Sequence, residues 1–185
     1  MRNRNKILSR LKATLDPERY KHSLRVAKTA LALGKKHRLS EDKLRTAALL
    51  HDCAKYYSRT QFFRAAKKLG LKFDPVKRLE PKLFHAEVSA ALAKNEFGVR
   101  NTAVLKAIKR HTTGAPGMSK LEKVIYLADH IEEGRDFDGV KKLRALAFRD
   151  LDKAIAASAS KTLDFLIKSN LPIHPETVAT RNYYL

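Results

Sequence analysis

The sequence lacks several features that would each point to a particular class of protein. It contains one cysteine, Cys53, so no disulfide can form within the chain, and a cytoplasmic location is expected. No apolar run approaches the roughly 18 residues that cross a bilayer, so no membrane association is expected. The basic first 15 residues are not followed by the apolar segment of a secretory signal.

The sequence also lacks internal repeats, low-complexity tracts and Gly/Ser-rich linkers that would divide it. Its 185 residues, 44% hydrophobic and 31% charged, suit one soluble globular domain with a substantial core. We therefore expect a single domain over residues 1–185, with a catalytic core at about 16–168 and a C-terminal tail at 169–185.

Acidic residues are scarce relative to basic ones. The chain has 19 Asp and Glu against 39 Lys and Arg, which gives a formal net charge of +20 at pH 7. In residues 1–40, twelve basic residues face only Asp16 and Glu18. Such an excess predicts attraction to polyanions, such as nucleic acid, anionic lipid or phosphorylated small molecules. A solvated basic surface without a ligand is equally compatible with the charge.

No segment alternates convincingly between polar and apolar residues, so no strand is predicted. Apolar residues instead recur at helical spacing, with start signals such as Asp16-Pro17 and the Ser119/Glu122 capping box. The pattern predicts helices over residues 17–38, 41–55, 60–69, 83–97, 102–111, 120–133, 139–147 and 150–168. Residues 70–82 are predicted to be the longest irregular connection. The expected fold is all-α, a single bundle of about eight or nine helices.

Residues that resist burial lie on the apolar faces of these helices. His51-Asp52 is flanked by apolar residues in LLHDCAK (49–55), and an unpartnered buried carboxylate costs several kcal/mol. The same misfit recurs at His22, His85, His111 and Asp129. Taken singly, each fits a hydrogen-bonded or salt-bridged core residue. Together, four imidazoles and two carboxylates from five predicted helices, without a thiolate, predict a ligand set for two metal ions.

The order of these residues resembles that of the HD-domain superfamily of metal-dependent phosphohydrolases. Within it the chain resembles the YqeK family, the symmetrical bis(5′-nucleosyl)-tetraphosphatases of bacteria. The resemblance rests on HSLRVA (22–27), LLHDCAK (49–55), FHAEVSA (84–90), KRHTTG (109–114), YLADHIEEGRDF (126–137) and LPIHPETVATRN (171–182). It implies an all-α HD bundle with metal ligands at His22, His51, Asp52, His85, His111 and Asp129. It also implies cleavage of diadenosine tetraphosphate into two ADP, with iron as the metal. Manganese, zinc or another divalent ion also suits these ligand types.

The residue types suggest how such a site would work. The carboxylate of Asp52 can bridge two metals, with His22, His51 and Asp129 completing one and His85 and His111 the other. Two metals about 3.5–4 Å apart can share a water and lower its pKa to about 7, which gives a metal-bridging hydroxide for attack on phosphorus. Asp52 is therefore the first catalytic candidate.

Basic and hydroxyl side chains near the predicted ligands are candidates for contacts with substrate phosphates. Helical spacing places Lys55 on the face of Asp52 and Arg25 on the face of His22. Lys55 is the second catalytic candidate. The phosphate-binding candidates are Arg25, Lys55, Thr112, Thr113 and, by resemblance, Arg135. A solvent-facing position is the alternative for each cation. His130 and His174 are interpreted as supporting and structural residues, respectively.

Two classes of function remain open from the sequence. The first is an enzyme that acts on a dinucleoside polyphosphate, or another HD-type phosphohydrolase that acts on a mononucleotide or cyclic nucleotide. The second is a basic nucleic-acid-binding module. The module would explain the charge but not six inward-facing ligand residues, and no zinc-finger or RNA-recognition signature is present. A homodimer is left open.

Overall fold

The computed structural model describes residues 2–185, and the prediction of an all-α fold is confirmed for them. They form eleven α-helices and one short 3-10 helix, somewhat more than the sequence predicted. In chain order these are α1 (Arg2–Thr14), α2 (Pro17–Lys36), α3 (Glu41–Leu50), α4 (Arg59–Lys68), α5 (Pro75–Leu79), η1 (Pro81–Phe84), α6 (His85–Asn95), α7 (Thr102–Arg110), α8 (Lys120–Ile131), α9 (Val140–Arg149), α10 (Leu151–Lys168) and α11 (Pro175–Tyr183).

The additional helices are α1, α5, η1 and α11. The connection at 70–82 is not irregular throughout, because Asp74 caps α5 and Pro75 occupies its first position. The C-terminal segment likewise contains α11, which begins at Pro175 after the cap residue His174. With five and nine residues, α5 and α11 are too short to show a clear helical period, so the sequence did not reveal them.

The predicted helix over residues 41–55 is too long. In the structure α3 ends at Leu50, and residues 51–56 form turns. His51 and Asp52 therefore lie directly after the helix rather than inside it. A turn at this point can direct two consecutive side chains toward the same centre, which two neighbouring positions of a helix, about 100° apart, do less readily.

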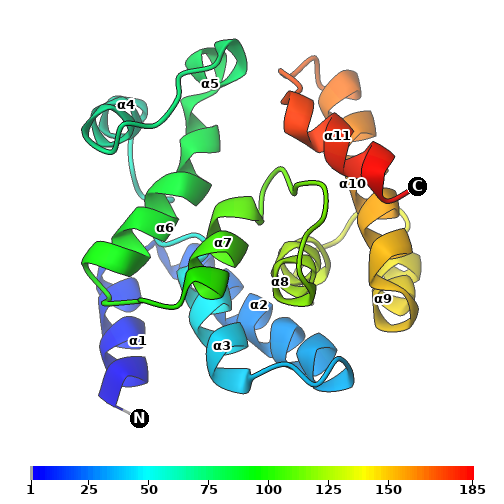
Figure 1. Ribbon diagram of the computed structural model, residues 1–185, viewed down its shortest axis with the longest axis horizontal. Helices are drawn as coiled ribbons and strands as arrows, with labels where there is room; N and C mark the ends of the chain where they lie inside the picture. Colours follow the sequence, from blue (N-terminus) through cyan, green and yellow to red (C-terminus); the bar gives the residue numbers. More distant parts are fainter. Residues whose placement is uncertain (1) are drawn as a thin grey trace.

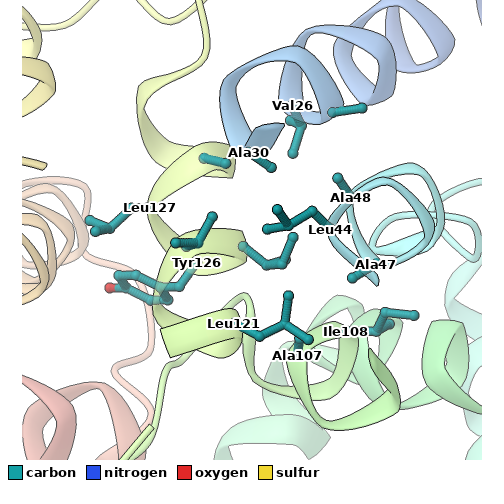
Figure 2. Packing of buried hydrophobic residues seen from close by; sticks show 14 of the residues in the cluster. Val26, Ala30, Leu44, Ala47, Ala48, Ala107, Ile108, Leu121, Tyr126 and Leu127 are labelled. Carbon is teal, nitrogen blue, oxygen red and sulfur yellow. The ribbon is translucent and has the colours of Figure 1, made fainter. Parts of the chain in front are cut away.

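The core lies between α2, α3, α7 and α8. Figure 2 shows apolar side chains from these four helices meeting, among them Ala30, Leu44, Ile108 and Leu121. Many contacts involve alanine or glycine, which lets the helix axes approach closely. At Gly34 of α2 a Cβ atom would overlap the side chain of Leu44 in α3. Four rigid helices are thus held in fixed register beneath the ligand-type residues.

The remaining helices flank this core on two sides (Figure 1). On one side α4, η1 and α6 enclose a second, smaller apolar cluster around Phe62, Phe84 and Val88. On the other side α10 packs against α8, α9 and α11. Among the described residues 2–185, no helix is both long and apolar enough to cross a bilayer.

Candidate metal centre

The structure brings all six predicted ligand residues together from five segments of the chain. His22 comes from α2, Asp129 from α8, and His51 and Asp52 from the turn after α3. His85 is the first residue of α6, and His111 directly follows α7. The side chain of Asp129 keeps 15% of its surface exposed, and the other five residues are buried.

Asp52 lies between two groups of ligand-type atoms. Its Oδ1 is 3.3 Å from Nε2 of His85 and 3.3 Å from Nε2 of His111. Its Oδ2 is 3.6 Å from Nε2 of His51 and 4.0 Å from Nε2 of His22. Each oxygen of this carboxylate therefore faces a different pair of imidazoles, as a bridging carboxylate requires.

Asp129 completes the group on the Oδ2 side. Its Oδ1 lies 3.1 Å from Nε2 of His22 and 3.9 Å from Nε2 of His51. Ligand atoms of His22, His51 and Asp129 lie within 4.8 Å of one another, and so do those of His51, Asp52 and His111. His51 thus neighbours both groups, whereas the sequence had assigned it to one.

All four imidazoles are held in the same orientation. Each Nδ1 lies within hydrogen-bonding distance of an oxygen that can only accept. The acceptors are Glu132 Oε1 for His22 (3.2 Å), the Ala48 carbonyl for His51 (2.7 Å), the Lys82 carbonyl for His85 (2.6 Å) and the Ile108 carbonyl for His111 (2.7 Å). Because the Nδ1–H donates outward, each Nε2 lone pair is directed into the centre, the form that binds a metal.

The donor set fits a pair of cations. Nε2 of His22, Nε2 of His51 and Oδ1 of Asp52 are buried and find no hydrogen-bond partner among the described residues, although such groups cost about 1–3 kcal/mol each when unsatisfied. Nε2 of His85 and Nε2 of His111 are 3.0 Å apart, and with both protons on Nδ1 their lone pairs repel. A divalent ion on each side of Asp52 would satisfy these atoms together.

The electrostatics keep the centre in the ionisation state that metals require. Burial lowers the pKa of His51 to about 4, and burial and the charge of Lys55 lower that of His85 well below its ordinary value. Burial opposes ionisation of Asp52 and Asp129, yet their pKa values lie well below the ordinary range. The ammonium of Lys55 favours the ionised form of Asp52 and lowers its pKa, and the guanidinium of Arg135 does the same for Asp129. With His51 and His85 held neutral, these ligands can bind cations without first losing protons.

Two supporting residues were missed by the sequence reasoning. Arg19 donates from Nη1 to Asp52 Oδ2 at 3.0 Å, so it helps to stabilise the buried carboxylate. Glu132, 1% exposed, accepts from His22 Nδ1. Arg19 is three residues before His22, and Glu132 is three residues after Asp129. Helical spacing from the ligands could therefore have identified both.

Arg135 and Lys55 lie beside the centre. Nη2 of Arg135 donates to Asp129 Oδ1 at 2.6 Å, and its Nε donates to the Asp129 carbonyl at 2.8 Å. Nζ of Lys55 lies 3.8 Å from Asp52 Oδ1. Both side chains are partly exposed, 40% for Arg135 and 28% for Lys55, so each can meet an incoming anion while it neighbours a carboxylate.

The other predicted phosphate contacts differ in their surroundings. Arg25 lies one step behind the centre, because its Nε donates to Glu132 Oε2 at 2.7 Å. Oγ1 of Thr112 is 2.9 Å from Nε2 of His85 and 3.1 Å from Nε2 of His111, so it lies at the centre itself. Thr113 donates to Glu176 of α11 instead. Thr112 is therefore the better placed of the two threonines.

The comparisons with known proteins agree with this geometry. A family model described as "HD domain" matches residues 19–134, the span from Arg19 to the loop after Asp129. The chain belongs to the HD-domain family. The match includes all six ligand-type residues of the centre.

Relatives of this HD-domain chain extend over nearly its whole length. The symmetrical bis(5′-nucleosyl)-tetraphosphatase of Halalkalibacterium halodurans is 40% identical over 99% of this chain and 97% of its own. The protein of the same name from Bacillus subtilis is 39% identical, over 98% and 97%. A crystal structure from Clostridium acetobutylicum, described as a predicted HD superfamily hydrolase involved in NAD metabolism, superposes with a TM-score of 0.94. It is 39% identical and covers 97% of this chain and 95% of that one. This HD domain is therefore a metal-dependent nucleotide phosphohydrolase.

Proposed function

We propose that the protein hydrolyses diadenosine tetraphosphate between its two central phosphates and releases two ADP. The observation that carries the proposal is the end-to-end similarity, at 39–40% identity, to two enzymes named for that symmetrical cleavage. The convergence of His22, His51, Asp52, His85, His111 and Asp129 supports it, because tetraphosphate cleavage needs strong local positive charge.

In this proposal the six residues would hold two divalent ions. Iron is the metal implied by the family, and the mixed imidazole and carboxylate set also accepts manganese or zinc. When bound, such ions acidify a shared water and neutralise charge on phosphoryl oxygens.

The chain's own residues orient the substrate and hold the site in shape. Arg135 and Lys55 are partly exposed cations beside the carboxylates, so they can contact the phosphoryl oxygens on either side of the scissile bond. The hydroxyl of Thr112 can donate to an oxygen of the same chain of phosphates. Arg19 and the four outward-facing Nδ1–H groups keep Asp52 and the imidazoles fixed, so little reorganisation is needed on binding.

Product analysis tests the proposal directly. The purified protein, with its metal content determined by elemental analysis, is incubated with diadenosine tetraphosphate, and the nucleotides are separated by chromatography. ADP as the sole product supports the proposal. ATP and AMP in equal amounts would show asymmetric cleavage and contradict it. A parallel incubation with NAD asks whether the description of the clostridial relative transfers to this chain.

A nucleotide phosphohydrolase with a different substrate is the second candidate within the enzyme class. A panel of mononucleotides and cyclic nucleotides, assayed for phosphate and nucleoside release, would identify it by a higher kcat/KM than for diadenosine tetraphosphate.

The net charge of +20 favours one candidate from another class, a nucleic-acid-binding module. Its signature would be tight binding to mixed oligonucleotides that weakens steeply with salt, in protein that has neither bound metal nor hydrolase activity.

A further inference from the structure

A cavity of about 670 Å³ opens between the end of α8, the loop at 135–138, and helices α9 and α10. Its size falls within the range of small-molecule sites in proteins, roughly 300–1,000 Å³. Arg135 lines it, and the same guanidinium donates to Asp129 at the metal centre. Arg135 therefore contacts both the cavity and the metal centre.

Two hydroxyls meet at the wall of this cavity. Ser158 lines it and is 1% exposed, and the buried hydroxyl of Tyr126 is close enough to hydrogen-bond with Ser158. Because the two hydroxyls can satisfy each other, the wall requires no ligand group at this point.

Aromatic rings line the same cavity and are exposed to solvent. Phe165 of α10 is 60% exposed and Phe137 of the loop is 37% exposed. Exposed phenylalanine rings offer flat faces on which a nucleic acid base can stack. Lys161 and Lys168 also line it, together with Asp138 and Asp164, and Nζ of Lys161 donates to the Asp138 carbonyl at 2.8 Å. With Arg135 the cations outnumber the carboxylates, so the cavity combines a stacking surface with a small excess of positive charge.

A second cavity near the centre lacks this combination. It measures about 220 Å³ and is lined by residues of α6, α7 and the following loop, including Thr112. No aromatic residue lines it. Its cations are largely paired: Lys77 and Lys109 with Glu87, and Arg110 with Glu122. Its chemistry suits phosphate better than a base.

We propose that the cavity between α8 and α10 binds one nucleoside of the substrate. The base stacks on Phe165, and Arg135 directs the attached phosphates toward Asp52 and Asp129. This inference deepens the proposed function and rests on it for the identity of the substrate. The lining of the cavity fits any nucleotide.

The experiment measures the affinity of the intact protein for ADP and for inorganic pyrophosphate by titration calorimetry. Phe165→Ala should weaken ADP binding at least about fivefold, because base stacking on an aromatic ring is lost, and leave pyrophosphate binding unchanged. Ile167→Ala is the matched control. Ile167 is an exposed residue of the same helix, 65% exposed, and does not line the cavity. Equal ADP affinities for the two variants would overturn the proposal. An equal loss of pyrophosphate binding in Phe165→Ala would do so as well.

The two proposals fail in different ways. If the wild type yields two ADP but Phe165→Ala binds ADP normally, the enzyme assignment stands and the nucleoside site is wrong. If the wild type leaves diadenosine tetraphosphate intact, while Phe165→Ala binds ADP more weakly than the wild type, the enzyme assignment is wrong and the nucleoside site stands. Wild-type protein that does not bind ADP would overturn the nucleoside site outright.

Discussion

Replacement of Glu132 by glutamine tests whether the metal centre depends on groups outside its ligand set. Oε1 of Glu132 accepts from His22 Nδ1 at 3.2 Å, and Oε2 accepts from Arg25 Nε at 2.7 Å and from the Gly134 amide at 2.5 Å. Both oxygens of the carboxylate therefore face donors. A glutamine of the same shape must turn its NH₂ group toward one of these sets, so a donor meets a donor in either orientation.

The expected effect is on metal affinity. Loss of the acceptor for Nδ1 frees the His22 imidazole to rotate or to move its proton to Nε2, and either change removes a ligand. Mutations of such outer hydrogen-bond partners typically cost 10–100-fold in metal affinity. That loss corresponds to about 1.4–2.8 kcal/mol. We expect Glu132→Gln to lie within this range for Mn²⁺, with affinity measured from the electron paramagnetic resonance signal of the free ion.

The adjacent residue supplies a matched control. Glu133 is also a glutamate, but its side chain is 57% exposed and pairs with Lys28 at the surface, where an ion pair contributes little. Glu133→Gln should leave Mn²⁺ affinity unchanged. Circular dichroism confirms that both variants keep their helices. If the two variants bind Mn²⁺ equally well, the argument that Glu132 orients His22 is refuted.

Three further outcomes are expected. Asp52→Ala should abolish hydrolysis while the circular dichroism spectrum remains helical, because the side chain lies after α3 rather than inside it; retained activity would remove its bridging role. Gly34→Ala should lower the free energy of unfolding by about 1–3 kcal/mol, measured by urea denaturation, because the new methyl group overlaps Leu44. An unchanged urea midpoint would show that α2 and α3 can separate without cost. The third outcome concerns Asp74. Burial raises the pKa of Asp74, but hydrogen bonds from the backbone of Lys77 and from His174 outweigh burial and lower this pKa below its ordinary value. The contribution of Asp74 to stability is therefore present at pH values above its ordinary pKa and is lost as the pH falls through the lowered pKa. Asp74→Asn, which keeps a capping oxygen, should be less sensitive to acid over that window in denaturant titrations at several pH values, and an identical acid dependence would contradict the reasoning.

The helices that carry the ligands could be read from the sequence because their apolar stripes are long enough to show a period. The side chains of Asp16, Ser40, Asn101 and Ser119 each accept from a backbone amide three residues later and so cap the helices that follow them. The short helices α5 and α11 could not be found in this way. They contain few buried residues and depend on contacts such as Asp74 with His174, which join segments 100 residues apart.

The sequence by itself determined the all-α class, the residue types of the centre, and the sides of α2 and α8 on which His22 and Asp129 lie. These follow from local periodicity and from the cost of burying imidazole and carboxylate groups. Tertiary structure alone decided that Asp52 presents one oxygen to each pair of imidazoles, that Arg25 supports Glu132 instead of the centre, and that an aromatic-lined cavity adjoins Arg135. Such features depend on how α2, α8 and α10 approach one another across long stretches of chain, and no local pattern encodes that approach.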